Sequence, residues 1–307
     1  MARTSNVART LISCFVVSLL AACASPGESG ASASASASAS ADDGAAAASA
    51  SSSMVTNATG ASLDAALSGA WRTPQNVARD KYRHPKETLS FFMVNADDTV
   101  IEITPGGGWY TEVLAPYLRD NGDYVAATWD DAITGQPNYR YGLNKDLRAK
   151  IASNADVYGK ADVRVFDPMH PNFGAANSAD IVLTFRNAHN WVEEGTAEAY
   201  FKAFFDVLKP GGTLGLVDHR AKPGTDLETQ KKSGYLTEAL VIGLAQSAGF
   251  KLDAKSEVNA NAADTTDHPN GVWTLPPTNQ HDAKDDAKYK AIGESDRMTL
   301  RFVKPAG

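Results

Sequence analysis

Residues 99–108 read TVIEITPGGG, an apolar strand pattern that runs directly into three consecutive glycines. β-Branched residues dominate its first half, which is typical of a strand buried on both faces. A glycine turn at the carboxyl end of a parallel strand lets a ligand approach the backbone, and the following helix offers free N–H groups. In open α/β sheets ligands bind at that edge. The stretch predicts a parallel α/β fold with a ligand cleft, and a tight turn without a ligand is the alternative for the glycines.

Short apolar runs recur from residue 98 onward and alternate with helical patterns. We expect strands at 99–103, 124–128, 163–166, 181–185, 213–217, 250–256 and 297–303. Helices are predicted after the glycine turn, where Pro116 should kink or shorten the helix, from Thr196 to Leu208, and over 233–249. Residues 259–292 show little periodicity and are expected to form a long surface excursion. The alternation indicates a mostly parallel sheet with helices on both faces.

The N-terminus carries the pattern of an export signal. Arg3 and Arg9 precede an apolar run over 11–20, which is too short for a permanent membrane span. The run ends in LAAC at 20–23, which resembles the bacterial lipobox, whose cysteine is acylated. We therefore expect a lipoprotein signal peptide at 1–22 and a periplasm-facing protein anchored in a membrane through lipid on Cys23. An ordinary signal peptide followed by an incidental cysteine is the alternative.

Composition sets the class of the remaining chain. Residues 23–63 are rich in Ala and Ser and predict a disordered tether, which leaves one folded domain at 64–307. Hydrophobic residues at 43% and charged residues at 21% are ordinary globular values. The net charge of −7 argues against nucleic-acid binding through overall charge, although a local basic patch stays open. The two cysteines, Cys14 and Cys23, precede the domain, so disulfides, cysteine nucleophiles and Cys-ligated zinc are excluded there.

Three motifs resemble class I S-adenosylmethionine-dependent methyltransferases. They are the acid-to-glycine run at 102–108, LKPGGTL at 208–214 and AGF at 248–250. More narrowly, YRHP at 82–85, PGGGWYT at 105–111 and TFRNAHNW at 184–191 resemble a subgroup of exported bacterial predicted methyltransferases. The resemblance covers about residues 71–307. It implies a Rossmann-like, seven-stranded, mostly parallel sheet with helices on both faces.

The resemblance also implies a cofactor site for S-adenosylmethionine. Gly106 and Gly108 would pass under the methionine part of the cofactor, with Glu102 contacting its amino group directly or through water. Asp130 would contact the ribose hydroxyls and Asp167 the adenine.

Two positions depart from the family pattern. Thr104 replaces the first glycine of the motif, and Thr128 stands where the ribose-binding acid is expected, two residues before Asp130. These departures favour a degenerate site, whereas Asp167 and the polar residues at 185–191 favour a functional one.

Polar residues cluster after the predicted strand 181–185. By the family resemblance this segment borders the methyl donor and the acceptor, so we expect catalytic roles for Arg186, Asn187 and His189. An imidazole at His189 can remove the acceptor's proton, and Arg186 can hold a substrate carboxylate or phosphate. The structural alternative is that Arg186 and Asn187 satisfy loop carbonyls.

Two further polar sets, at 82–84 and 218–220, are candidates for lining the same cleft. His189 and His219 suggest a metal site together with Asp218 or Asp167, but no metal-ligand spacing is present, and we predict no metal.

Two functions fit these observations. The first is methyl transfer from S-adenosylmethionine to an unidentified small-molecule or envelope acceptor. The second is a lipid-tethered binding module that keeps the fold and transfers no methyl group, favoured by the departures above and by the cytoplasmic origin of S-adenosylmethionine. Fold by itself does not decide between them.

Overall fold

The computed structural model describes residues 62–307, and the fold below is that of these residues. The predicted signal peptide, Cys23 and nearly all of the predicted tether lie outside the described residues. Within 62–307, no helix has both the length and the apolar character that a membrane crossing requires.

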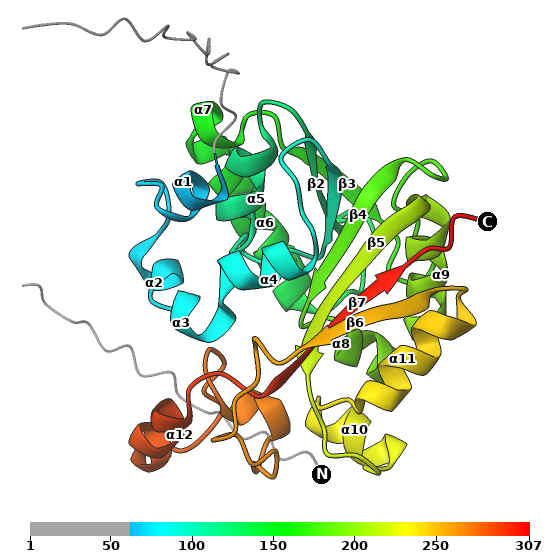
Figure 1. Ribbon diagram of the computed structural model, residues 1–307. Coiled ribbons are helices and arrows are strands. Elements are labelled where there is room, and N and C mark those ends of the chain that lie inside the picture. Colours follow the sequence, from blue (N-terminus) through cyan, green and yellow to red (C-terminus); the bar gives the residue numbers. More distant parts are fainter. Residues whose placement is uncertain (1–61) are drawn as a thin grey trace, which may run out of the picture. The chain divides into compact units, whose positions relative to one another are not determined.

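One seven-stranded sheet organises the domain (Figure 1). The strands are β1 (Thr99–Ile103), β2 (Asp123–Trp129), β3 (Asp162–Phe166), β4 (Ala179–Phe185), β5 (Leu208–His219), β6 (Lys251–Ser256) and β7 (Arg297–Val303). Their order is β3-β2-β1-β4-β5-β7-β6, and neighbours from β3 to β5 are parallel. β7 runs antiparallel between β5 and β6. The predicted seven-stranded, mostly parallel sheet is confirmed.

Helices cover both faces of the sheet. They are α1 (Leu63–Leu67), α2 (Pro74–Val77), α3 (Asp80–Arg83), α4 (Pro85–Phe91), α5 (Thr111–Leu118), α6 (Asn138–Ser153), α7 (Ala155–Tyr158), α8 (Ala188–Glu194), α9 (Ala197–Val207), α10 (Leu227–Ser233), α11 (Glu238–Ser247) and α12 (Asp286–Ile292), with short 3₁₀ turns η1 (Gly271–Thr274) and η2 (Ala283–Asp285). Alternate residues of β1 point to opposite faces: Val100 packs with α4 and α5, whereas Ile101 and Ile103 pack with α9 and α11. Pro116 lies inside α5, which is short as predicted.

The helix predicted over 233–249 is wrong at its beginning. α10 ends at Gly234, whose left-handed φ of +72° terminates the helix, and α11 begins only after Thr237. Between them, Leu236 donates its backbone N–H to the carbonyl of His219 at 2.9 Å. The polar end of β5 is thereby fixed in place.

Residues 259–292 are more than the predicted surface excursion. Val272, Leu275 and Tyr289 are buried within it. Asn259 donates to the hydroxyls of Thr88 at 3.1 Å and Thr299 at 2.9 Å, which ties the segment to α4 and β7. The hydrophobic periodicity of this segment is weak because it contains no long helix or strand, and side-chain hydrogen bonds attach it to the rest of the domain.

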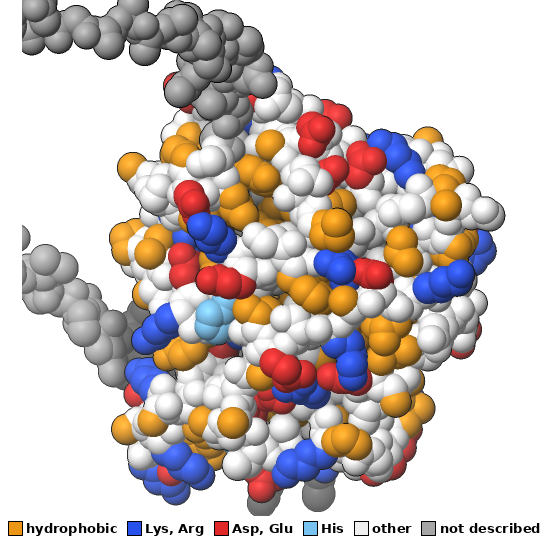
Figure 2. All heavy atoms as spheres, in the orientation of Figure 1, with side chains coloured by type: hydrophobic (Ala, Val, Ile, Leu, Met, Phe, Trp, Pro, Cys, Tyr) orange, Lys and Arg blue, Asp and Glu red, His pale blue; other side chains and the backbone are white. Residues whose placement is uncertain are grey.

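The face shown in Figure 2 carries a mixed surface. Lys and Arg side chains are interspersed with Asp and Glu, and hydrophobic side chains form small separate groups. This face therefore presents no field of a single sign.

Candidate active site

A cleft of about 1080 Å³ lies where β1, β2, β4 and β5 end. The lining residues come from the glycine turn after β1, from the segment before α4 and from the first turns of α6. Others come from α8 and from the 259–292 segment. Among the lining residues are Arg79, Arg83, Glu102, Thr104, Gly106, Gly107, Trp109, Trp129, Arg140, Arg186, Asn187, His189, His219 and Trp273. The cleft occupies the edge at which open α/β sheets bind ligands.

The glycine turn after β1 forms the floor of one half of the cleft. Gly106 has a φ of +60°, and a Cβ atom built on it meets no protein atom within 4 Å. Packing therefore does not require glycine here, whereas the left-handed backbone favours it. Thr104 also adopts a positive φ, of +47°, and its buried hydroxyl has no hydrogen-bond partner among the described residues.

Gly108 has a different reason for being glycine. A Cβ there would lie 2.8 Å from Cδ of Lys150, which reaches over from α6 to donate to Glu112 at 2.6 Å. Gly108 is outside the cleft lining, so the structure explains it by helix packing, and its predicted cofactor contact stays a prediction.

Glu102 is the acidic group beside the glycine turn. It is 3% exposed, and the hydroxyl of Tyr124 donates to its Oε2 at 2.6 Å. Burial raises the pKa of Glu102 to about 7, against the opposing effects of the Tyr124 hydrogen bond and of Arg83. The carboxyl group is thus poised between its neutral and ionised forms at neutral pH, and a cationic ligand favours the ionised form.

The two predicted aspartates lie outside the cleft lining. Asp130 accepts the N–H of Ala132 at 2.9 Å. Asp167 accepts the N–H of Met169 at 2.8 Å and pairs with His170, and these hydrogen bonds lower its pKa. Both carboxylates accept hydrogen bonds from groups in their own turns. The ribose contact of Asp130 and the adenine contact of Asp167 stay predictions.

Aromatic and basic side chains occupy the region where those acids were expected. Trp129, the last residue of β2, has the guanidinium of Arg140 5.1 Å from its ring centre and Tyr139 edge-on at 6.0 Å. Arg140 is paired with Glu194 at the end of α8. The sequence pattern did not predict this group of Trp129, Tyr139 and Arg140, and the available signal was the tryptophan directly after the predicted strand 124–128.

A buried carboxylate fixes His189 at the start of α8. Asp218, fully buried in β5, accepts from Nδ1 of His189 at 2.9 Å and from its backbone N–H at 3.1 Å. Because an ionised carboxylate only accepts, Nδ1 carries the proton and Nε2 is left as the basic nitrogen. His189 lines the cleft, and an imidazole oriented in this way is able to accept a proton from a bound group.

Asn187 holds the turn between β4 and α8. Its amide donates to the carbonyl of Ile103 at 2.9 Å and to the hydroxyl of Thr184 at 3.1 Å. The first bond links β4 to the end of β1 just before the glycine turn. The structure therefore gives Asn187 a positioning role beside its place in the cleft lining.

His219 is a neutral acceptor beside Arg186. Burial, followed by the nearby cations, lowers the pKa of His219 well below its ordinary value. Its Nε2 accepts from Nε of Arg186 at 3.4 Å, and its Nδ1 contacts the hydroxyl of Ser295. His189, Asp218 and His219 are close enough to hold a metal ion. A metal there would displace the hydrogen bonds of Asp218 and face a guanidinium, which opposes a second cation.

Arg186 is held in a strained backbone conformation. Its φ is +64°, which is unusual for a residue other than glycine. Its backbone N–H donates to the carbonyl of Val217 at 2.7 Å. Burial lowers its pKa to about 10, which keeps it cationic at neutral pH. The strain directs a charged side chain into the cleft.

The structure brings together five of the predicted site residues. Glu102, Gly106, Arg186, Asn187 and His189 line one cleft. The remaining three, Gly108, Asp130 and Asp167, do not line it. Of the two further polar sets, Arg83 and His219 also line the cleft, whereas Arg220 pairs with Asp296 elsewhere.

Comparison with known proteins identifies the fold. No family model matches the chain, and no curated protein matches it. A methyltransferase from Aquifex aeolicus, named as S-adenosylmethionine-dependent, is 15% identical with a TM-score of 0.48, over 76% of this chain and 94% of that one. A protein from Methanosarcina mazei with the same description is 14% identical with a TM-score of 0.47, over 71% and 97%. A third structure, the 4+2 cyclase SpnF, is 16% identical with a TM-score of 0.52, over 73% and 82%.

The strand order, together with the match to SpnF at a TM-score above 0.5, shows the seven-stranded α/β fold expected of class I methyltransferases. At such low identities the likeness concerns the fold and not the reaction. One of the three neighbours is named as a cyclase. The fold therefore does not determine the reaction, which depends on the residues that line the cleft.

Proposed function

We propose that the protein transfers the methyl group of S-adenosylmethionine to an acceptor bound beside Arg186 and His189. The observation that carries this proposal is the Asp218-oriented imidazole of His189 in the same cleft as the glycine turn. A donor site and a fixed base are the two parts that methyl transfer to a protonated heteroatom needs.

The residues at the glycine turn fit the cofactor. The open space over Gly106 accommodates a ligand against the backbone, the free hydroxyl of Thr104 offers a hydrogen bond, and Glu102 offers a carboxylate for an amino group. Trp129 and Arg140 line the cleft in place of the expected acids. When bound, S-adenosylmethionine supplies an electrophilic methyl group on a sulfonium.

The chain's own residues supply orientation and proton removal. Nε2 of His189 takes the proton of the acceptor, and Asp218 stabilises the imidazolium that forms. Asn187 fixes the turn that carries His189 against β1. Trp273 also lines the cleft, with its ring centre 6.1 Å from that of His189.

Calorimetric titration with S-adenosylhomocysteine, the demethylated product, tests the cofactor site. Gly106→Val places a branched side chain in the cleft and should abolish measurable binding. Gly135→Val is the matched control, because Gly135 also has a left-handed φ, of +82°, with open surroundings, but lies outside the cleft lining. Equal affinities in the two variants, or no binding by the wild type at millimolar ligand, contradict the proposed site.

Offering labelled S-adenosylmethionine to the protein together with envelope extracts tests methyl transfer. Label should appear in an acceptor with the wild type and should be lost with His189→Ala. Ligand binding with no transfer to any extract would instead support the second function, a binding module. That alternative is favoured by the positions of Asp130 and Asp167 outside the cleft and by the cyclase neighbour.

We also propose that the protein is an exported lipoprotein of the bacterial envelope, as the motifs at 1–23 and the resemblance to the exported subgroup indicate. Its acceptor is then a small molecule or envelope component outside the cytoplasm. Cys23→Ser should release the protein from membrane fractions. Unchanged membrane association, with no labelled fatty acid on the wild type, contradicts this proposal.

A further inference from the structure

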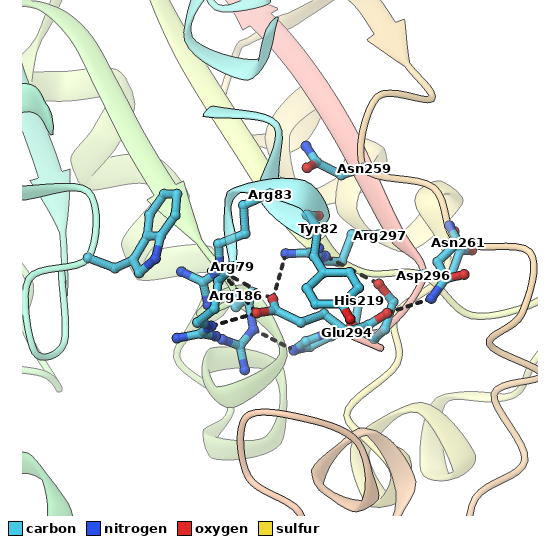
Figure 3. A network of polar contacts seen from close by, with 12 residues as sticks. Arg79, Tyr82, Arg83, Arg186, His219, Asn259, Asn261, Glu294, Asp296 and Arg297 are labelled. Atoms are coloured by element: carbon cyan, nitrogen blue, oxygen red, sulfur yellow. Dashed lines mark hydrogen bonds and ion pairs between the residues drawn. The ribbon is translucent and has the colours of Figure 1, made fainter. Parts of the chain in front are cut away.

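An excess of buried positive charge lies at one end of the cleft. Glu294 accepts from Nε of Arg79 at 2.7 Å and from Nε of Arg83 at 3.2 Å, and it pairs with Arg297 at 3.2 Å. The Arg186 guanidinium is close enough for Glu294 to act on its pKa. Figure 3 shows these side chains converging from segments far apart in the sequence. Three guanidinium groups therefore share one carboxylate, and a fourth, that of Arg186, lies near it.

The second nearby acid does not balance this charge. Asp218 is occupied by three N–H donors, two from His189 and one from the backbone of His219 at 2.7 Å. Within residues 62–307, Arg186 forms no ion pair, and its one side-chain hydrogen bond is the 3.4 Å contact to His219. The arginine cluster (Arg79, Arg83, Arg186 and Arg297) thus carries donors that the described chain leaves unsatisfied.

Three members of the arginine cluster lie at the cleft. Arg79, Arg83 and Arg186 line it, whereas Glu294 is 3% exposed and, with Arg297, lies behind them. Nη2 of Arg79 is buried and has no hydrogen-bond partner among the described residues. An anion entering the cleft therefore meets guanidinium groups first and the carboxylate last.

The cluster is pre-organised. Arg83 stacks on Trp109, with its guanidinium 4.6 Å from the ring centre, and Arg186 is directed by its strained backbone. Burial lowers the pKa of Arg83 and of Arg186 to about 10. Burial by itself would raise the pKa of Glu294, but the guanidinium groups together outweigh it and lower that pKa to about 2. All of these groups are charged at neutral pH, so the cations outnumber Glu294, and a further anion reduces the repulsion among them.

We propose that Arg79, Arg83 and Arg186 bind an oxyanion, a carboxylate or a phosphate, of the ligand that the cleft accepts as methyl acceptor. Guanidinium forks match both oxyanions in a bidentate manner. Arg186 contacts His219, whose ring centre is 4.9 Å from that of His189, so a ligand anchored there reaches the proposed base. The assignment of this ligand as the acceptor rests on the methyl transfer proposed above, whereas the oxyanion site itself does not.

Calorimetric titration of the full chain with inorganic phosphate, and separately with succinate, tests the site at constant ionic strength. We expect binding by the wild type, and affinities at least about tenfold weaker in Arg186→Gln and Arg79→Gln. Arg148→Gln is the matched control, because Arg148 is an exposed arginine paired with Asp131 outside the cleft lining. Tighter phosphate binding identifies a phosphate-bearing ligand, and tighter succinate binding identifies a carboxylate.

Glu294→Gln separates ligand binding from a structural role. Removing the carboxylate frees its arginine partners, so the affinity for the preferred anion should rise by roughly tenfold. Should the variant be unstable, phosphate or succinate should raise its melting temperature more than that of the wild type. No anion binding by the wild type at tens of millimolar, or equal affinities in the wild type and the arginine variants, overturns the proposal.

The cofactor's own carboxylate is the competing occupant. S-adenosylhomocysteine affinity should be unchanged in Arg186→Gln, and phosphate should not compete with it. Parallel loss of both affinities, with competition, overturns the assignment to an acceptor. Anion binding without any S-adenosylhomocysteine binding contradicts the proposed methyl transfer but leaves the oxyanion site standing.

Discussion

Replacing Glu102 with Gln should have a more favourable effect on the free energy of unfolding at pH 8 than at pH 5. The carboxyl group is 3% exposed and its pKa rises from 4.5 to about 7 on folding, mainly through burial. Between these two pH values the folded chain binds more protons than the unfolded chain, so the free energy of unfolding falls as pH rises. Gln keeps the size of the side chain and an acceptor for the Tyr124 hydroxyl, but it does not titrate.

The magnitude follows from the two pKa values. The raised pKa of Glu102 lowers the free energy of unfolding by about 3 kcal/mol at pH 8 and by about 1 kcal/mol at pH 5, relative to a group that does not titrate. The effect of Glu102→Gln on the free energy of unfolding should therefore be roughly 2–3 kcal/mol more favourable at pH 8 than at pH 5. Packing changes caused by the amide cancel in this difference because they are the same at both pH values.

Urea denaturation followed by circular dichroism at the two pH values provides the measurement. Glu87→Gln, at an exposed position in α4, controls for the substitution itself. If Glu102→Gln changes the free energy of unfolding by the same amount at pH 5 and pH 8, ionisation of the Glu102 carboxyl group does not destabilise the folded protein. The explanation of Glu102 as a buried group retained for a cationic ligand would then be refuted.

Further predictions concern the base and the glycines. His189→Ala should reduce turnover with an identified acceptor by roughly 10²–10⁴-fold and leave S-adenosylhomocysteine affinity unchanged; equal losses of both would make His189 part of the cofactor pocket. Asp218→Asn should reduce turnover with little change in that affinity, because the amide can donate to Nδ1 of His189 and shift the proton to Nε2; wild-type turnover would rule out the proposed tautomer. Gly108→Ala should lower the free energy of unfolding by more than about 1 kcal/mol, because φ is +81° and the Cβ meets Lys150. Gly142→Ala, inside α6 with open space at its Cβ, should raise that free energy by about 0.5–1 kcal/mol, and denaturation curves check both glycine variants.

The local pattern of the sequence predicted the strands well. The strands at 99–103 and 297–303 have the predicted limits, because buried strands require runs of apolar, β-branched residues that are visible without any tertiary information. The helix predicted over 233–249 was wrong because a continuous apolar pattern hid the left-handed turn at Gly234.

The candidate site was only partly visible in the sequence. Glu102, Gly106, Arg186 and His189 stand next to strand ends, and strand ends of a parallel sheet meet at one edge. Asp130 and Asp167 also follow strands, but their carboxylates bond the backbone of their own turns, and a pattern of residue types does not show where a side chain points.

The sequence by itself determined the parallel α/β class, the glycine turn and the polar segment after β4, because each depends on residues adjacent in the chain. Only the tertiary structure decided the partners of these groups. Asp218 comes 29 residues after the histidine that it orients, and Glu294 comes 211 residues after Arg83. Hydrogen bonds and charges act over a few ångströms in space, whatever the separation in sequence, so the oriented base and the arginine cluster exist only in the folded chain.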